Sequence, residues 1–458
     1  MSDDQGAQTP PTNQTSSPSP VERMLNNMGA DLAPMVGRHV LARLGEGGQP
    51  PEFGVRLINV GNESYLKVLE EEYFEDLLKF GSSFKLVQGY FGGGKTHFLY
   101  CVRELAWEHD FATAVVELSP TECPYDDSLK VYRAVARRVG RQPIKPFDAV
   151  LGLPALLREL IDERLMSARA AGHSEVDARL DVERWLQTTV SRAPCESSSY
   201  RQAVVGFAMA HLERDWRLGS RLEAWLLGEA VPLGEVRSVG VYETMERSNG
   251  FTMLRCLTQM MVAVGMAGTA LLFDEVDRTL SVSARRSQVI GDNLRQVIDL
   301  CGRHQLPHTL FMYAVPPEFM RNVVPDYPAL YQRLKSPVPL STRSPQAVLI
   351  DLEKLDLAPE ELLTRLGERL IDLFEVARRA KLDRAVQSHN AREIARACVD
   401  AYFEVNHRRL FAKTWVDFLF HQKADGEVAL GPGAAVDIVL TGYDALINSP
   451  AVDDFADF

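Results

Sequence analysis

Short apolar runs and helical spacings alternate along the first third of the chain. Phe84–Gln88 is an apolar run that predicts a strand, and helical spacing follows from Lys95 to about residue 109. Residues 111–118 (FATAVVEL) form a second buried run, and helical spacing returns over Leu129–Val139. Strands and helices in this order are typical of the beginning of a parallel sheet. We therefore predict the α/β class.

Between about residues 145 and 235 the pattern changes, and only helical periods occur. Leu153, Leu156, Leu157 and Leu160, for example, fit one such helix. The alternation then resumes, with helices expected at about residues 249–265 and 284–301 and strands at 270–273 and 309–315. We predict that the middle segment is a helical insertion in the sheet domain. It either forms a partner or substrate surface or only stabilises the domain.

The terminal regions are predicted to be disordered or helical. Residues 1–20 are rich in Pro, Ser, Thr and Gln and have almost nothing to bury, which is typical of disorder. A helix is expected over Val21–Leu44, and it ends at the Gly- and Pro-rich loop of residues 45–51. After Pro345 a strand-like run, VLIDLEKL, leads into a series of helices, the last expected at about residues 436–447.

Composition is that of an ordinary soluble globular protein, with 46% apolar and 24% charged residues. A chain of 458 residues is long enough for two or three packed units. The net charge of −12 argues against a surface that is basic overall. Contact with a nucleic acid would therefore need a local basic patch, and the bulk charge does not exclude DNA.

Cysteine usage and the N-terminal sequence bear on the compartment. The six cysteines are scattered and form no CxxC pair, so we expect neither a zinc site nor a disulfide framework and favour a reducing cytoplasm. The N-terminal segment has no apolar stretch of the kind that a signal peptide needs. The most apolar region, Leu257–Phe273, contains polar residues and runs into two acids, so it is no membrane span. We expect a cytoplasmic protein without a membrane partner.

A complete phosphate-binding motif, G-x-x-x-x-G-K-[ST], lies between the first strand and its helix. Its residues are Gly89, Tyr90, Phe91, Gly92, Gly93, Gly94, Lys95 and Thr96. Glycines allow the backbone N–H groups to surround phosphates, and the helix N-terminus adds a positive dipole end. Lys95 is predicted to reach the β- and γ-phosphates of ATP, and the Thr96 hydroxyl to ligate Mg²⁺. His97 follows, and it either adjoins the nucleotide or packs in the helix.

The second part of the site is expected at Asp274 and Glu275. They follow the apolar run Ala270–Phe273, which delivers two carboxylates at the end of a buried strand. Many strands end in acids, so this pattern alone is weak, but paired with a full phosphate-binding loop it indicates a magnesium ligand at Asp274. The adjacent Glu275 is predicted to be the general base that activates water, which favours hydrolysis over transfer to another acceptor.

Other nucleotide contacts are predicted from position along the chain. Ile58, Val60 and Gly61 precede the first helix of the α/β region, where related ATPases hold the adenine; core packing is the alternative. The strand over residues 309–315 should lie beside Asp274, and its end carries a polar sensor of the γ-phosphate in related ATPases. Tyr313 is the nearest polar side chain there, with packing as the alternative.

Arginines supply the remaining candidates. Arg333 is predicted to be an arginine finger that acts across a subunit interface, with Arg321 and Arg343 as competitors. Arg392 lies near the start of a C-terminal helix, which is a typical place for a sensor arginine. Arg396 would be its salt-bridging or DNA-facing neighbour.

A small basic cluster lies further along the C-terminal part of the chain. It consists of the run His407–Arg409 and of Lys413. We expect these side chains to form a solvated helix face, and a nucleic-acid contact is the alternative.

The run VGNESYLKVLEEEYFEDLLKFGSSFKLVQGYFGGGKTHFLYCVREL, followed by a strand ending in ELSP, resembles the BrxD-like ATP-binding proteins of bacterial BREX-type phage-defence systems. LLFDEVD and the Asn-x-Arg at residues 390–392 are similar to the same family, which commonly has Pro where this chain has Ala391. The resemblance covers about residues 35–420 and is most specific over residues 58–120. It implies an AAA+ core with a helical lid, and ATP-driven work on DNA or on partner proteins of a defence operon.

We therefore expect three parts: a disordered tail (1–20), an AAA+ nucleotide-binding α/β domain (21–345) with its helical insertion, and a C-terminal helical lid and tail (346–458). The predicted function is hydrolysis of Mg-ATP coupled to DNA handling or complex assembly in anti-phage defence. A homo-oligomer or a complex with other defence proteins is expected. The alternatives are a nucleotide-gated interaction switch with negligible turnover and a transposition-type target-selection ATPase.

Overall fold

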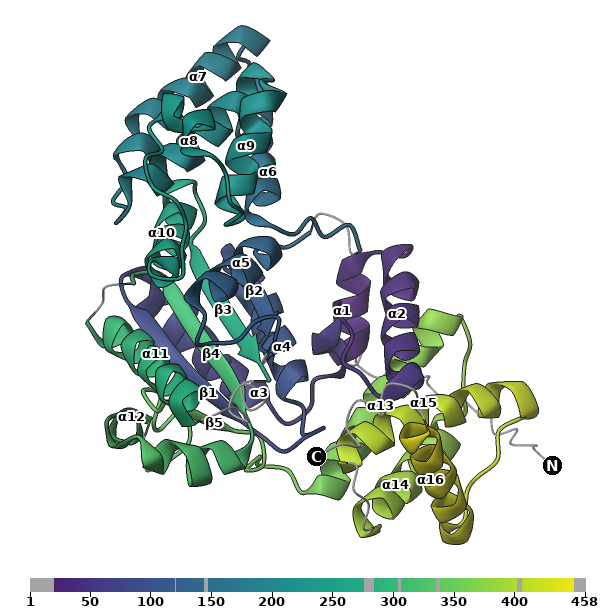
Figure 1. The fold of residues 1–458 in the computed structure, drawn as a ribbon. Helices are drawn as coiled ribbons and strands as arrows, with labels where there is room; N and C mark the ends of the chain where they lie inside the picture. Colours follow the sequence, from purple (N-terminus) through teal and green to yellow (C-terminus); the bar gives the residue numbers. More distant parts are fainter. Residues whose placement is uncertain are drawn as a thin grey trace, which may run out of the picture.

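A five-stranded parallel sheet forms the centre of the part of the protein that contains the glycine loop, residues 89–96 (Figure 1). The structure is a computed structural model, which describes residues 20–119, 121–143, 147–275, 284–303, 306–334, 338–401 and 406–448. The strands are β1 (Ser82–Gln88), β2 (Phe111–Glu117), β3 (Gly268–Asp274), β4 (Thr309–Val315) and β5 (Leu349–Asp351). Their order is β2-β3-β4-β1-β5, and all their pairings are parallel.

The central strands are buried on both faces, as helices on both sides of a parallel sheet require. All residues of β3 and β4 are buried. On one face the rings of Phe273 and Tyr313 stack with centroids 4.8 Å apart, and Phe84 stacks on Tyr313 at 5.1 Å. On the other face Leu272 and Met312 join the core beneath the helix that follows the glycine loop. The predicted α/β class with a parallel sheet is confirmed.

Helices cover both faces of this sheet. One face carries α4 (Lys95–Glu108) and α3 (Glu63–Val68), the latter extended by a π-helical turn over Leu69–Phe74. The opposite face carries α5 (Ser128–Arg138), α10 (Gly250–Ala263) and α11 (Ala284–Gly302), and α12 (Pro328–Leu334) packs on α11. Within the described residues, no helix is both long and apolar enough to cross a bilayer.

The middle segment forms a helical layer that extends away from the sheet, at the top of Figure 1. Its helices are α6 (Leu153–Ala170), α7 (Glu175–Thr188), α8 (Ser198–Glu213) and α9 (Trp216–Leu226). Tyr132 of α5 connects this layer to the sheet domain, because its hydroxyl donates to the Leu226 carbonyl at 2.6 Å and lies 3.0 Å from the Tyr200 hydroxyl. The layer and the sheet domain share one hydrophobic core.

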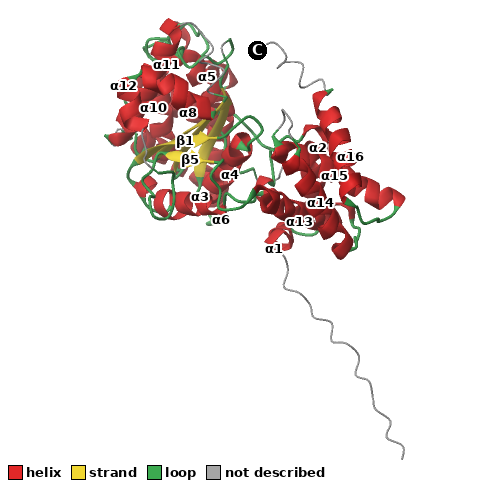
Figure 2. Ribbon diagram, turned by 90° about the horizontal axis from the view of Figure 1, so that it is seen from below, coloured by secondary structure: helices red, strands yellow, loops and turns green. Residues whose placement is uncertain are grey.

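The two ends of the described chain build one helical bundle. Its members are α1 (Pro20–Met28), α2 (Leu32–Gly47), α13 (Pro359–Arg378), α14 (Arg384–Asp400), α15 (His407–Asp425) and α16 (Pro432–Ile447). Figure 2 shows the bundle as a separate group of helices beside the sheet, with α4 on the side that faces it.

The N-terminal helices correct two sequence predictions. A single helix over Val21–Leu44, assigned to the α/β domain, is in fact two helices that pack into the bundle. The break lies at Gly29, whose φ of 88° is a left-handed conformation that glycine adopts without penalty. Gly37 allows α2 to approach α13, because a Cβ there would lie 2.9 Å from the Cβ of Ala377. These contacts join segments far apart in sequence, so periodicity along the chain carries no sign of them.

Candidate functional site

The glycine loop connects the end of β1 to the start of α4. The Gly89 N–H donates to the Val315 carbonyl at 3.2 Å, which fixes the start of the loop on the neighbouring strand. Gly92 and Gly94 have φ values of 72° and 92°, a region that other residues rarely adopt. Gly94 caps α4 without a side-chain hydrogen bond. The first N–H groups of α4 thus remain for a bound anion, and the helix dipole favours negative charge there.

Lys95 extends back across this loop. Its Nζ donates to the carbonyl of Gly89 at 3.0 Å and to the carbonyl of Tyr90 at 3.2 Å. These contacts hold the ammonium group at the edge of the loop rather than in bulk solvent. The predicted partner of the phosphates is therefore in place beside the backbone that would surround them.

Thr96 and Asp274 meet at the end of the sheet. The Thr96 hydroxyl donates to Asp274 Oδ2 at 2.5 Å, across 178 positions of sequence. The Asp274 side chain is almost fully buried, and burial raises the pKa of its carboxyl, against the hydrogen bonds from Thr96 and from the Glu275 N–H. A hydroxyl and a buried carboxylate are hard oxygen ligands of the kind that Mg²⁺ prefers. A divalent cation would offset the cost of burying the carboxylate, so these residues fit the predicted metal.

Glu275 follows in a strained conformation. Its φ is +56°, and its N–H donates to Asp274 Oδ1 at 2.9 Å. A non-glycine residue in this region is uncommon, and such residues concentrate at functional sites. The turn places a second carboxylate directly beyond the first at the end of β3.

The helical bundle contacts the outer side of the loop through Arg408. Its Nη1 donates to the Gly93 carbonyl at 2.6 Å, and its Nη2 donates to the Leu352 carbonyl at 2.8 Å. Burial lowers the pKa of Arg408, partly opposed by the nearby Glu353 carboxylate. Glu353 in turn accepts the Tyr90 N–H at 2.9 Å. One guanidinium thus joins the loop, the segment after β5 and the start of α15.

The remainder of the predicted basic cluster is also occupied by protein contacts. Arg409 Nε donates to the Gly47 carbonyl at 2.9 Å, and Lys413 Nζ donates to the Gly45 carbonyl at 2.8 Å. Basic side chains often bond the free carbonyls at a helix end, here those of α2. The expectation of a solvated helix face is therefore wrong for Arg408, Arg409 and Lys413. The contact of Arg408 with the loop could not be predicted from the sequence, because its partner Gly93 lies 315 positions away.

The predicted adenine-contacting residues lie between the sheet domain and the bundle. Val60 is buried, and Gly61 has a φ of 86° and packs close to Leu362 of α13. His97 Nε2 lies 3.2 Å from Asn59 Oδ1. Burial, followed by the charges of nearby arginines, lowers the pKa of His97 to about 4. The imidazole is therefore neutral at neutral pH, and the structure brings it beside the segment that contains Val60 and Gly61.

Tyr313 lies in the core instead of at the loop. Its side chain is fully buried between Phe84 and Phe273, and its hydroxyl is hydrogen-bonded to that of Tyr125. Burial raises the pKa of Tyr313 well above its ordinary value. The expected sensor role is therefore replaced by the packing alternative. The alternation along a strand shows which side chains share a face of the sheet, but it does not show which helices cover that face. Tyr313 lies on the face of the sheet opposite α4.

The other candidate arginines lie apart from the loop. Arg333 of α12 forms a two-pronged ion pair with Asp299 of α11, one N–O distance being 3.0 Å. Arg392 is exposed on α14, and Arg396 of the same helix pairs with Glu393 at 3.1 Å. Among the described residues of the bundle, Arg408 is the arginine that donates a hydrogen bond to the loop, and Arg409 lies over the ring of Phe91. The sensor role of Arg392 remains a prediction.

Arg321 and Arg343, the alternatives to Arg333, are both exposed.

A glycine loop between a strand and a helix, with Lys95, Thr96 and Asp274 gathered at the ends of parallel strands, is consistent with a P-loop NTPase-like fold. The chain belongs to the family described as BREX system ATP-binding protein BrxC/D, which it matches over residues 33–428. No curated protein matches it. The resemblance predicted from residues 58–120 is confirmed, and the family identifies an ATP-binding component of a phage-defence system.

Proposed function

We propose that this protein hydrolyses Mg-ATP at the glycine loop and couples turnover to DNA handling or complex assembly in phage defence. The observation that carries the proposal is the 2.5 Å contact between the Thr96 hydroxyl and Asp274, beside a lysine that already lies across the loop. These are the groups that a magnesium-bound triphosphate needs in P-loop enzymes. The strand order, in which β4 separates β1 from β3, and the bundle that contacts the loop support an AAA+ core.

Each residue has a distinct proposed role. Lys95 exchanges its two carbonyl partners for the β- and γ-phosphate oxygens when ATP binds. Thr96 and Asp274 would hold Mg²⁺ through their side-chain oxygens. Bound Mg²⁺ supplies charge neutralisation at the β- and γ-phosphate oxygens. Glu275 orients the attacking water and accepts its proton.

The bundle supplies the remaining group. Arg408 is within reach of the loop and is held by two backbone carbonyls. We assign to it the positioning of the loop against the bundle, so that loss or gain of phosphates changes how the two halves meet.

Arg333 is proposed as a finger that acts on a neighbouring subunit, which requires that its pair with Asp299 opens on assembly. Val60, Gly61 and His97 would contact the base.

Substitution of the general base tests hydrolysis directly. In Glu275→Gln, ATP binding should remain near wild type, because the loop and Lys95 are unchanged. Phosphate release should fall by roughly 100-fold or more, since general-base catalysis contributes that much. The measurement is steady-state phosphate release beside equilibrium binding of a fluorescent ATP analogue, each with Mg²⁺.

A nucleotide-gated switch gives a different result. In that case wild type binds ATP but releases no phosphate, whether DNA or partner proteins are added or not, and Glu275→Gln is indistinguishable from it. Such an outcome contradicts the enzyme and leaves an ATP-binding interaction module.

A further inference from the structure

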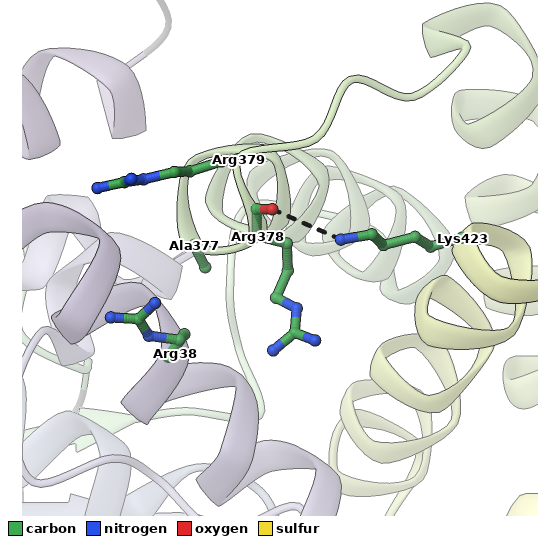
Figure 3. A pocket seen from close by; sticks show the side chains of 5 residues that line it. All are labelled: Arg38, Ala377, Arg378, Arg379 and Lys423. Atoms are coloured by element: carbon green, nitrogen blue, oxygen red, sulfur yellow. Dashed lines mark hydrogen bonds between the residues drawn. The ribbon is translucent and has the colours of Figure 1, made fainter.

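A strongly basic pocket lies on the helical bundle, away from the glycine loop. It has a volume of about 300 Å³ and is lined by Arg38, Ala377, Arg378, Arg379 and Lys423 (Figure 3). Arg38 comes from α2, Arg378 and Arg379 from the end of α13, and Lys423 from α15. In the view of Figure 3 the Arg378 side chain extends between Arg38 and Lys423. Three segments far apart in sequence thus bring four cations together.

These four side chains differ from several other cations of the same bundle, which are paired with acids. Examples of such pairs are Arg384–Asp372, Arg396–Glu393, Lys381–Glu375 and Lys413–Asp417. Within the part of the chain that the structure describes, none of the pocket's four cations forms an ion pair, and all four are exposed. Like charges held together repel unless an anion joins them. This grouping occurs in a protein whose net charge is −12.

Two contacts inside the protein account for only part of the arrangement. Cations are favoured at helix C-termini, and Lys423 Nζ lies 3.5 Å from the Arg378 carbonyl at the end of α13. The Arg378 guanidinium lies over the Phe420 ring, with its carbon 5.1 Å from the ring centre. Neither contact neutralises a charge. Arg38 belongs to a different helix and owes nothing to the α13 terminus.

The side-chain types point to a phosphate ligand. Arginine presents a planar fork that matches two phosphate oxygens, and three of the four cations are arginines. The residues that line the pocket include no aromatic ring on which an unpaired base could stack. Single-strand binders normally use such rings, whereas duplex binders that are indifferent to sequence rely on backbone contacts alone.

We propose that this pocket binds the phosphate backbone of a nucleic-acid duplex, without regard to base sequence. The same helix α15 carries Lys423 in the pocket and Arg408 at the glycine loop, about 22 Å apart at 1.5 Å per residue. The other wall, α2, carries Arg38 and ends at Gly47, which Arg409 contacts. Duplex bound in the pocket therefore bears on α15, whose first turn contacts the glycine loop, and on α2, whose last turn contacts Arg409 of α15. Binding itself does not depend on hydrolysis.

Neutralisation of the pocket in the full-length protein tests the proposal. The variant Arg378→Gln/Arg379→Gln/Lys423→Gln is compared with wild type for binding of a short fluorescein-labelled DNA duplex by anisotropy, without nucleotide, over a series of salt concentrations. Affinity should fall roughly 10-fold or more, and the slope of log K against log salt should become shallower by about 2 to 3. All three side chains are exposed, so the variant should remain folded, and its melting temperature checks this.

A matched control removes the same charge elsewhere. Arg192→Gln/Arg217→Gln/Arg237→Gln alters three exposed arginines in and just after the helical insertion and should bind the duplex like wild type. An RNA duplex that binds through the same residues supports a shared backbone chemistry.

The first result that would overturn the proposal is a pocket variant that binds the duplex with wild-type affinity, and the second is an equal loss of duplex affinity in the control variant. The third is tighter binding of a single strand than of the duplex. The last is binding of polyglutamate or inorganic phosphate that depends on the pocket residues, with no binding of the duplex. The first two would show that the pocket is not the duplex site, and the last would assign it to an acidic protein or a small anion. Loss of this proposal leaves phosphate release by the glycine loop unaffected, and loss of hydrolysis leaves duplex binding unaffected.

Discussion

The two sides of the nucleotide site differ in how they are assembled. On the sheet side, Lys95 and Thr96 are adjacent in sequence, and Asp274 and Glu275 are adjacent at the end of β3. On the bundle side, the contact comes from Arg408, which has Gly93 as its partner 315 positions away. The residues proposed for the chemistry therefore come from short motifs at the ends of strands, whereas the contact of Arg408 with the loop depends on how the two ends of the chain fold together.

The largest expected effects come from removing charge on the sheet side. Lys95→Ala and Arg333→Ala should each reduce phosphate release by roughly 100-fold or more, because each removes a cation from the transferring phosphates. Mixed together, the two variants should recover part of the activity, since an intact Arg333 from one subunit can serve an intact Lys95 site in another. Phosphate release from the separate and mixed proteins measures this. Absence of recovery counts against Arg333 as a finger and leaves it as the structural partner of Asp299.

The sheet contains a buried cation, Lys85, whereas the four cations of the bundle pocket are exposed. The buried cation makes the stability of the fold depend on pH. Lys85 of β1 is 1% exposed, and its Nζ donates to the Tyr73 hydroxyl at 2.5 Å and to the Ala347 carbonyl at 2.6 Å. Burial lowers the pKa of Lys85 from 10.5 to about 7. Below pH 7 Lys85 is charged in both the folded and the unfolded chain, so burial of the cation destabilises the fold to the full extent. Between pH 7 and 10.5 only the unfolded chain holds the proton, and stability rises with pH.

The prediction is that this one residue adds a positive slope to stability between pH 7 and 10, of up to about 1.4 kcal/mol per pH unit. Lys85→Met should remove that slope, although the two oxygens that lose a donor lower its stability at alkaline pH. Urea unfolding at pH 7, 8 and 9 gives the free energies. Equal slopes in the two proteins would show that Lys85 stays protonated in the fold.

The sheet and its motifs could be predicted because the signals are local. The apolar run at residues 309–315 coincides with β4, and the glycine loop is complete within eight residues. The parallel order of strands then places Thr96 beside Asp274 without further information. A strand–loop–helix motif that must accommodate phosphate leaves little freedom in sequence, so the sequence is informative there.

The bundle side could not be predicted in the same way. The sequence predicts Arg392 near the start of a helix, but α14 begins at Arg384, so Arg392 lies in the middle of that helix. The start of α15 is the one that reaches the loop. The first helices look alike in periodicity whether they pack on the sheet or on α13. Side-chain contacts between elements hundreds of residues apart depend on how the helices pack together. The close approach of Gly37 to Ala377 is one such contact, and no pattern in the sequence predicts it.

The most direct test of this account compares two arginines of the bundle. Steady-state phosphate release with Mg-ATP is measured for wild type, Arg408→Gln and Arg392→Gln, with melting temperatures as a check on folding. Removal of two charge-assisted hydrogen bonds to the loop region should lower phosphate release in Arg408→Gln roughly 10- to 100-fold. Arg392→Gln, at an exposed position apart from the loop, should lower it less. The reverse result, with Arg392→Gln impaired and Arg408→Gln active, would contradict the role given to Arg408.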